Sequence, residues 1–290
     1  MVNKILYVTI KTMATMNKDE WRQLTDILKV VILLYVARTM YLAMYQPREG
    51  FAQTTSPLDN VYVINMPKRT DRYRSFLTKY KAAGLKTGAL KKFEAVVGKD
   101  LDLDDVPLTD LAREELKDLY DNGYRTKHYQ LTEGAIGCYL SHVGLWNRIY
   151  DNDEPLALIF EDDAAIPPNF KPLLDQAMHK MEQADPQWDV FVLDVLCRDC
   201  LPYYEDIIKV KKFYLLHAYV IRRQAIQKLK DADALFPIEQ QIDWVLSKNS
   251  KLLNIYSVRN GIVKQGGFTT DIQKPLHIVK GGDPFEEVSV

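Results

Sequence analysis

The hydrophobic residues of this chain gather in short uninterrupted runs, and longer polar stretches with helical spacing separate these runs. The run 156–160 does not alternate with polar residues, so it predicts a strand that is buried on both faces. The run 188–193 predicts another buried strand, and the β-branched and aromatic residues at 61–65 predict a first, short strand. The predicted strands are 61–65, 92–97, 156–160, 188–193, 214–221 and 252–258, and the predicted helices are 70–83, 109–120, 131–150, 170–183 and 222–232. Strands that alternate with helices indicate an α/β fold, with a mostly parallel central sheet flanked by helices.

The most apolar long segment of the chain is 27–45. It has the length of a membrane-spanning helix, which needs about 20 mostly apolar residues. However, Lys29 and Arg38 lie inside it, and a central arginine costs about 2.5–3.5 kcal/mol against about 0.3–0.6 kcal/mol gained for each Leu, Ile or Val. The basic residues that precede it would keep the N-terminus in the cytoplasm; they are Lys4, Lys11, Lys18 and Arg22. Two interpretations stay open: the anchor of a single-pass type II membrane protein, or an amphipathic, partner-binding helix of a cytoplasmic protein.

A polar stretch with proline, glycine and threonine at 46–60 predicts a linker. We therefore divide the chain into an N-terminal segment, 1–60, and a globular domain, 61–290. The 290 residues are 47% hydrophobic and 27% charged, which is ordinary globular composition. The formal net charge is −1, and no basic run with interleaved aromatic residues occurs, so nucleic acid is not an expected partner.

Three cysteines are too few for a fold held together by disulfides. Cys197 and Cys200 form a single Cys-x-x-Cys pair, which supplies only half of a structural zinc site. The pair follows a predicted strand and does not open a helix, as a thioredoxin-like redox motif would. We interpret these residues as free or loosely paired thiols at the start of an irregular loop that extends over 198–206.

Three carboxylates, Glu161, Asp162 and Asp163, directly follow the buried run 156–160. They therefore lie at the carboxyl end of a predicted strand, which is where open α/β sheets bind their ligands. Three adjacent carboxylates repel one another, and a hard divalent cation with oxygen ligands offsets this repulsion. The alternative is a solvated acidic turn, which is the commonest state of a run of charges.

Two more segments carry polar residues where ligands bind. The basic cluster 68–72 lies between the first predicted strand and the next helix, which suits an anionic ligand such as a diphosphate, although a solvated basic turn has the same composition. The helix 131–150 contains Gly134 and Gly137, each of which costs about 1 kcal/mol relative to Ala. Such a cost is tolerated where a backbone or a ligand approaches closely. His142 in this helix, taken alone, is more typical of a hydrogen-bonded core histidine.

Four segments, in this order, resemble glycosyltransferase family 25, which includes bacterial lipopolysaccharide glycosyltransferases and animal procollagen galactosyltransferases. Residues 63–72 are similar to the family's opening I-N-L-x-R-R-x-D-R strand and turn, and residues 93–98 to its F-x-A-v-d-G piece. Residues 131–142 with Trp146 are similar to the L-x-x-G-E-I-G-C-x-L-S-H…W segment, which is the most specific match. The strand that ends in Glu-Asp-Asp completes the resemblance, which covers roughly 61–246.

The resemblance implies a GT-A fold, that is, a nucleotide-sugar-binding α/β domain with a D-x-D-like metal motif. It also implies transfer of a hexose, galactose or glucose, from a UDP-sugar to a hydroxyl of a glycan or protein acceptor, with inversion at the anomeric carbon. The expected cofactor is Mn²⁺ or Mg²⁺, because a departing diphosphate needs its charge neutralised.

The resemblance also assigns roles to individual residues. Glu161 and Asp163 are the expected metal ligands, with Asp163 the first choice. An inverting displacement needs a base on the acceptor hydroxyl, and Asp243, at the start of a predicted short helix, is our hypothesis for this base. The expected donor-binding residues are Asn65, Arg69, Arg72, Gly137, Ser141, His142 and Asp162.

The sequence departs from the family pattern at Ala135, where the family usually has Glu. The role of that carboxylate is therefore missing, and a catalytically inactive sugar- or nucleotide-binding homologue is the alternative function. A metal-dependent phosphohydrolase would need a second acidic cluster and a Thr/Ser-Lys pair downstream, and the sequence contains neither.

Overall fold

The computed structural model describes residues 56–127 and 129–267, together with 17–19, 21, 22, 25, 26 and 29. The chain divides into two compact units, Met1–Thr54 and Thr55–Val290, and the predicted site lies in the second. The segment 27–45, the candidate membrane anchor, lies outside the described residues apart from Lys29. Within the described residues, no helix combines the length and the apolar character that crossing a membrane requires.

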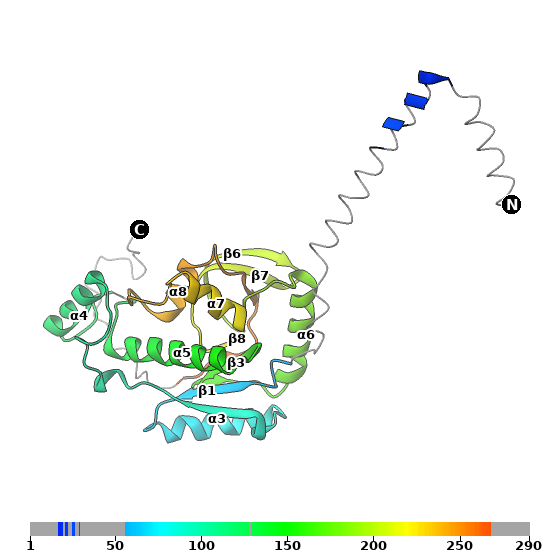
Figure 1. The fold of residues 1–290 in the computed structure, drawn as a ribbon. Helices are drawn as coiled ribbons and strands as arrows, with labels where there is room; N and C mark the ends of the chain where they lie inside the picture. The colour runs from blue at the N-terminus through cyan, green and yellow to red at the C-terminus, as the bar shows by residue number, and fades with distance from the viewer. Residues whose placement is uncertain are drawn as a thin grey trace. The chain divides into compact units, whose positions relative to one another are not determined.

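The described part of the second unit forms an eight-stranded sheet with the strand order β2-β1-β3-β8-β5-β9-β7-β6 (Figure 1). The strands are β1 Val61–Asn65, β2 Leu90–Glu94, β3 Leu156–Glu161, β5 Val190–Val192, β6 Leu196–Tyr204, β7 Ile207–Tyr214, β8 Ala218–Arg222 and β9 Ile255–Val258. A separate pair of short strands joins β4 Ala164–Ala165 to β10 Lys264–Gln265. The strands predicted at 61–65 and 156–160 are confirmed as β1 and β3.

Helices cover both faces of the sheet. They are α3 Thr70–Ala82, α4 Asp110–Asn122, α5 Glu133–Asp151, α6 Phe170–Ala184, α7 Arg223–Asp231 and α8 Ile242–Lys248, with 3-10 turns at Thr87–Ala89 and Gly98–Asp100. Along β1, Val61 and Val63 pack in a core with residues of α3 and α6, whereas Tyr62 and Ile64 pack in a second core with residues of α4, α5, α7 and α8. Burying one such side chain contributes about 1.5–3 kcal/mol, so both cores hold the sheet in place.

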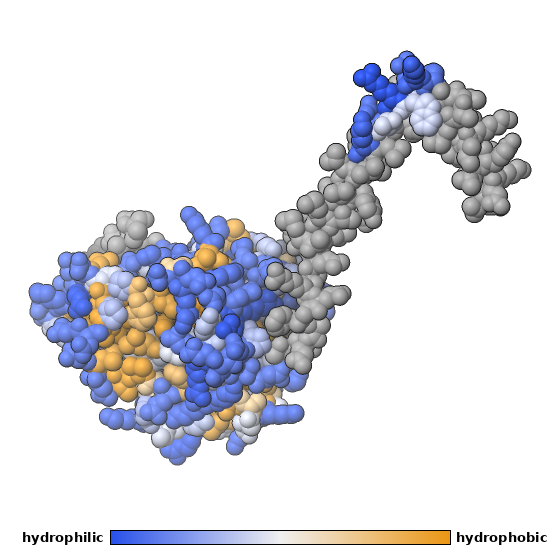
Figure 2. All heavy atoms as spheres, in the orientation of Figure 1, coloured by the Kyte–Doolittle hydropathy of each residue, from blue (hydrophilic) through white to orange (hydrophobic). Residues whose placement is uncertain are grey.

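The surface of this unit is mostly hydrophilic on the face that Figure 2 shows, with hydrophobic residues visible beside α4 and α5. Helix α4 buries Ala112, Leu116 and Leu119 on one side and exposes Leu111 and Tyr120. It is thus an amphipathic helix that packs by one stripe of residues.

The prediction of a mostly parallel sheet is wrong, because the sheet is mixed. The pairs β1–β2, β1–β3 and β5–β9 are parallel. The pairs β3–β8, β5–β8, β7–β9 and β6–β7 are antiparallel. The apolar runs indicated burial on both faces, and helices provide that burial whatever the direction of the strand. Burial alone therefore does not reveal strand direction.

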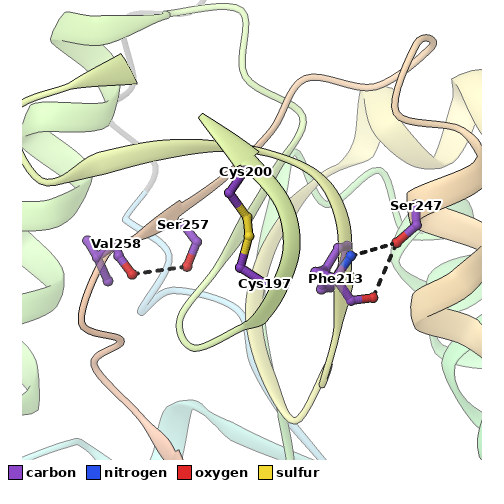
Figure 3. Close-up of a disulfide and its surroundings, with 6 residues drawn as sticks. All are labelled: Cys197, Cys200, Phe213, Ser247, Ser257 and Val258. Carbon is purple, nitrogen blue, oxygen red and sulfur yellow. Dashed lines mark hydrogen bonds between the residues drawn. A yellow bond between two sulfur atoms is a disulfide. The ribbon is translucent and has the colours of Figure 1, made fainter. Parts of the chain in front are cut away.

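The prediction of an irregular loop at 198–206 is also wrong, because this stretch belongs to the β6–β7 hairpin. Cys197 and Cys200 are joined in a disulfide within β6, and are not free thiols (Figure 3). Strand β6 lies at the edge of the sheet, and almost all of its residues are exposed. An exposed edge strand needs no periodic pattern of apolar residues, which is why the sequence did not reveal it.

Three neighbouring strands of the mixed sheet, β1, β3 and β8, bring polar residues to the same end of the sheet, where β1 and β3 terminate. Strands β1 and β3 are parallel, so Asn65 and Glu161 at their carboxyl ends lie close together. Strand β8 is antiparallel to β3, and Phe160 pairs with Ala218. The amino end of β8 therefore lies beside the carboxyl end of β3. His217, just before β8, accepts a hydrogen bond from the Glu161 N–H through its carbonyl (2.8 Å). The mixed topology therefore places the carboxyl end of β3 next to the amino end of β8.

Candidate functional site

A cavity of about 830 Å³ opens at the end of the sheet where β1 and β3 terminate. Residues of β1, β3, α5 and α8 and of the turns beside them line it, although these segments are far apart in the sequence. The expected site residues that line the cavity are Arg69, Arg72, Ser141, His142, Glu161, Asp162, Asp163 and Asp243. Asn65 and Gly137 are not among the lining residues. The structure thus brings together most of the residues that the sequence pointed to.

The carboxylate of Asp162 is tied into the protein. It accepts a hydrogen bond from Asn65 Nδ2 (2.6 Å) and pairs with Arg72 Nη1 (3.3 Å). Asn65 Nδ2 also donates to the carbonyl of Arg69 (3.0 Å). Burial raises the pKa of Asp162 despite these contacts with Asn65 and Arg72. This buried cluster joins the ends of β1 and β3 to α3, so Asn65 lies behind the cavity wall and supports it.

Glu161 contacts a chain of buried side chains from α5 and β8. His142 Nε2 lies 3.1 Å from Glu161 Oε1, and His142 Nδ1 lies 2.8 Å from Tyr219 Oη, which accepts a hydrogen bond from Trp146 Nε1 (2.8 Å). Tyr219 can donate its hydroxyl hydrogen to Nδ1, so that Nε2–H donates to Glu161. Burial raises the pKa of Glu161, but the hydrogen bond with His142 and nearby positive charge, including that of Arg72, outweigh burial, and the pKa lies below its usual value.

His142 is therefore a buried histidine with both ring nitrogens engaged. It forms, with Cys138 and Glu161, a group of three possible metal-binding side chains whose ligand atoms lie within 4.8 Å of one another. Cys138 Sγ is 3.9 Å from Glu161 Oε1, and burial followed by the charge of Glu161 raises the pKa of its thiol well above the usual value. A neutral thiol and a hydrogen-bonded imidazole make this group part of the wall of the cavity.

The first turns of α5 pack directly on the segment that follows β2. Thr132 caps the helix by accepting a hydrogen bond from the Ala135 N–H (3.0 Å). Ser141 Oγ donates to the Gly137 carbonyl (2.6 Å) and accepts from the Val96 N–H (2.8 Å). A Cβ on Gly137 would lie 2.7 Å from backbone atoms of Val96 and Gly98. Helix α5 can thus pack closely on the segment 96–98, because Ser141 Oγ hydrogen-bonds to that segment and Gly137 has no side chain.

Asp163 differs from its two neighbours. Its Oδ2 accepts a hydrogen bond from Gln265 Nε2 (3.1 Å), and its carbonyl accepts one from the Gly266 N–H (2.8 Å). Its buried Oδ1 has no hydrogen-bond partner among the described residues. Burial, followed by the charge of Glu161, raises the pKa of Asp163 to about 6. A buried acceptor without a partner is costly, and a cation would offset that cost.

Asp243 lies in the first turn of α8, as the sequence predicted, and only 8% of its surface is exposed. Its Oδ1 accepts a hydrogen bond from the Trp244 N–H (2.8 Å), and its Oδ2 accepts one from the Leu215 N–H (3.1 Å). Burial raises its pKa to about 6 despite these hydrogen bonds. The carboxylate is held in one orientation beside the cavity, and its raised pKa suits a group that accepts a proton near neutral pH.

The basic residues before α3 are engaged with acidic neighbours. Arg69 pairs with Asp71 (3.1 Å), and Arg72 pairs with the buried Asp162. Thr70 is the first residue of α3, and the N-cap residue Arg69 makes no capping hydrogen bond with its side chain. The arginines nevertheless line the cavity, where an anion would meet their positive charge.

Several residues of the cavity wall were missed by reasoning from the sequence. Tyr129 and Tyr214 are stacked with ring centroids 3.8 Å apart, and Gln265 lies in the short strand β10. His217 is 1% exposed and also lines the cavity. The only signal for His217 was a single polar residue inside a mostly apolar stretch.

Comparisons with known proteins identify the family of this chain. The profile of glycosyltransferase family 25 (LPS biosynthesis protein) matches residues 58–244. The chain therefore belongs to glycosyltransferase family 25. This match is carried by the region that contains β1, α5, β3 and the start of α8.

Individual relatives are more distant. The chain is 25% identical to human procollagen galactosyltransferase 2 over 200 residues, which are 66% of this chain and 31% of that protein. It is 27% identical to zebrafish (Danio rerio) procollagen galactosyltransferase 1 over 200 residues, or 66% of this chain and 32% of the relative. It is 29% identical to bovine "Probable inactive glycosyltransferase 25 family member 3" over 140 residues, or 47% of this chain and 21% of the relative. The matches thus span about a third of these relatives or less.

Proposed function

We propose that this protein is an inverting glycosyltransferase of the GT-A type, which moves a hexose from a UDP-sugar to a hydroxyl of a glycan or protein acceptor. Galactose or glucose is the expected sugar. The observation that carries the proposal is the 830 Å³ cavity, where cationic, acidic and helix-terminal groups from distant segments meet. Membership of glycosyltransferase family 25 and the similarity to procollagen galactosyltransferases support it.

The cavity offers different chemistry on its two sides. Arg69 and Arg72 come from the turn after β1, where their charge suits the diphosphate of a nucleotide sugar. Asp243 comes from α8, with a pKa of about 6. An acceptor placed between the donor and Asp243 would be activated from the side opposite to the leaving group, which is what an inverting displacement requires.

The residues present fit a divalent cation. Asp163 offers a buried carboxylate oxygen without a partner, and Glu161 offers a second carboxylate on the same wall. Oxygen ligands of this kind suit Mg²⁺ or Mn²⁺. When bound, such a cation would supply positive charge to the departing diphosphate.

In the proposed reaction, Asp243 takes the proton of the acceptor hydroxyl. The acceptor oxygen forms a bond to the anomeric carbon, and the bond from that carbon to the diphosphate oxygen breaks. The nucleoside diphosphate leaves with the electron pair of that bond, close to Arg69 and Arg72. His142 and Tyr219 hold Glu161 in place, and Asn65 holds Asp162.

Release of nucleoside diphosphate from a panel of nucleotide sugars tests the proposal. The full chain is incubated with each donor in Mn²⁺, Mg²⁺ or EDTA, beside the variants Asp163→Asn and Asp175→Asn. Asp175 lies on the exposed side of α6, in an ion pair with Lys171, and serves as the matched control. We expect metal-dependent release from one UDP-sugar, lowered about 100-fold or more in Asp163→Asn and unchanged in Asp175→Asn. Equal release by the parent and Asp163→Asn would contradict the metal assignment.

The second candidate function is nucleotide-sugar binding without turnover. Ala135 in place of the family's usual Glu favours it, and so does the similarity to a bovine family member whose name calls it probably inactive. The same assay distinguishes the two functions. A folded protein that binds UDP but releases no diphosphate from any donor would be the binding homologue.

A further inference from the structure

His217 is a buried histidine that the proposed reaction does not yet use. It lies just before β8, where its carbonyl accepts the Glu161 N–H, so its backbone is fixed next to the acidic end of β3. Only 1% of its surface is exposed, and it lines the cavity. A buried imidazole usually has partners for both ring nitrogens, so the contacts of each nitrogen are informative.

The hydrogen bonds of His217 determine which nitrogen carries the proton. Nε2 lies 3.0 Å from the carbonyl oxygen of Val263, and a carbonyl can only accept, so Nε2 is the N–H donor. In the neutral ring, Nδ1 then carries a lone pair. Nδ1 is buried and has no hydrogen-bond partner among the described residues. The ring therefore presents an unpaired acceptor atom.

The same wall holds a second acceptor of this kind. Asp163 Oδ1 is buried and unpartnered within the described chain, while its other oxygen is held by Gln265. His217 and Asp163 are both hydrogen-bonded to the segment around β10, His217 through the Val263 carbonyl and Asp163 through Gln265 Nε2 (3.1 Å). The His217 carbonyl also accepts the Glu161 N–H, so the backbone holds the imidazole next to the acidic residues. One hydroxyl hydrogen could pair with only one of the two acceptors. A cation can be bound by both at once.

We propose that His217 Nδ1 is a ligand of the divalent cation, together with the carboxylate of Asp163. This inference rests on the proposed function for the presence of a cation, and adds a nitrogen ligand to a site that the sequence described as all-oxygen. A metal-bound histidine commonly donates its other N–H to a backbone carbonyl, as His217 does to Val263. Imidazole suits transition metals better than Mg²⁺, so the site should prefer Mn²⁺ over Mg²⁺.

The other histidine near the acidic residues is a weaker candidate for the same role. His142 lies with Cys138 and Glu161 in the group of possible ligands, but its two nitrogens contact Glu161 and Tyr219. Coordination by His142 would require breaking one of these hydrogen bonds. Coordination by His217 breaks no hydrogen bond among the described residues, because Nδ1 has no partner there.

Pulsed electron paramagnetic resonance of Mn²⁺ tests the proposal without relying on activity. The full chain is loaded with Mn²⁺ and UDP, and electron spin echo modulation reports whether a nitrogen is bonded to the metal. We expect ¹⁴N modulation that changes to the ¹⁵N pattern when the protein is made with ¹⁵N-histidine. This labelling leaves the fold untouched, so it identifies histidine ligation even if a variant fails to fold.

Variants then identify which histidine is the ligand. We expect His217→Gln to lose the nitrogen modulation and to bind Mn²⁺ at least about tenfold more weakly, with a smaller change for Mg²⁺. His179→Gln, on the exposed side of α6, is the matched control and should retain the modulation, and His142→Gln tests the other buried histidine of the cavity. Mn²⁺ binding without histidine modulation, or modulation lost only in His142→Gln, would overturn the assignment of His217.

The outcomes also separate this inference from the proposed function. Metal-dependent donor hydrolysis without a histidine signal would overturn only the role of His217. Absence of both Mn²⁺ binding and donor hydrolysis would overturn both proposals. Metal-independent hydrolysis without Mn²⁺ binding would overturn the His217 proposal and the metal requirement, and would leave the transferase in place.

Discussion

The two sides of the cavity handle their polar groups differently. On the parallel side, formed by β1, β3 and α3, the charged groups neutralise one another: Asp162 is bound by both Asn65 and Arg72, and Asn65 Oδ1, a buried atom without a partner among the described residues, is neutral. On the antiparallel side, near β8 and α8, His217 Nδ1 has no partner among the described residues, and Asp243 accepts only backbone hydrogen bonds. Asp163 lies between the two sides, with one oxygen bound and one unpartnered.

This difference predicts that the parallel side contributes mainly to stability and the antiparallel side mainly to activity. Groups that pair with one another, such as Arg72 and Asp162, stabilise the fold in addition to lining the cavity. Groups that are buried without a matching partner destabilise the fold, and such a cost is typical of binding and catalytic positions. We therefore expect substitutions on the parallel side to change stability most, and substitutions on the antiparallel side to change activity most.

Asp243→Asn should have the largest effect, and the effect should be on activity. Removing a general base lowers the turnover rate by about 10²–10⁴-fold, whereas the donor side of the cavity is unchanged. Steady-state transfer rates and UDP affinity, measured by calorimetry, would check both parts. Transfer within tenfold of the parent, in a protein where Asp163→Asn is inactive, would remove Asp243 from the role of base.

Arg72→Gln should have the largest effect on stability. It leaves the buried carboxylate of Asp162 without its cationic partner, and breaking a buried pair costs about 3–5 kcal/mol. Urea unfolding at pH 7 would measure the loss. Arg74→Gln, on the exposed side of the same helix, is the control and should change the free energy of unfolding by less than about 0.5 kcal/mol. A similar loss of unfolding free energy in both variants would contradict the stabilising role of the parallel side.

The pH dependence of transfer should follow Asp243. Its pKa is raised by burial to about 6, and a base must be deprotonated, so the rate should fall about tenfold for each pH unit below 6 and level off above about pH 7. The profile is best measured with saturating Mn²⁺, because a bound cation lowers the pKa of a carboxyl ligand such as Asp163. A flat profile between pH 5 and 8 would mean that another group controls the rate.

The smallest effect should come from the disulfide at the far edge of the antiparallel region. Cys197 and Cys200 close a very short loop, so replacing both with Ser should lower the free energy of unfolding by about 2 kcal/mol or less. Thermal unfolding with and without dithiothreitol would check this value. The reductant should lower the melting temperature of the parent and leave the double variant unchanged. A lowered melting temperature in both proteins would mean that the effect of dithiothreitol does not come from this disulfide.

The sequence predicted the parallel side of the cavity better than the antiparallel side. Glu161, Asp162 and Asp163 could be recognised because they are adjacent and follow a buried strand. Arg72 and His142 were found because they lie in short motifs that resemble the family. His217 could not be found in this way, because its meaning depends on strand direction and on a carbonyl of Val263 that is distant in the sequence.

The sequence does not indicate the direction in which a side chain points. Asn65, Gly137 and Ser141 are predicted donor-binding residues, and of these only Ser141 lines the cavity. Asn65 donates a hydrogen bond to Asp162, and Gly137 packs against the segment after β2. Position in a motif indicates proximity to a site. Whether a residue faces the cavity or supports its wall depends on packing that only the three-dimensional structure provides.

The contact between Gly98 and Gly137 has a consequence for how this protein can be altered. A Cβ on Gly98 would lie 1.9 Å from the carbonyl oxygen of Glu133, and one on Gly137 would lie 2.7 Å from the Gly98 nitrogen. Because glycine is already the smallest residue, a larger residue at one position cannot be compensated by a smaller one at the other. Directed evolution of sugar preference would therefore have to proceed through the other walls of the cavity.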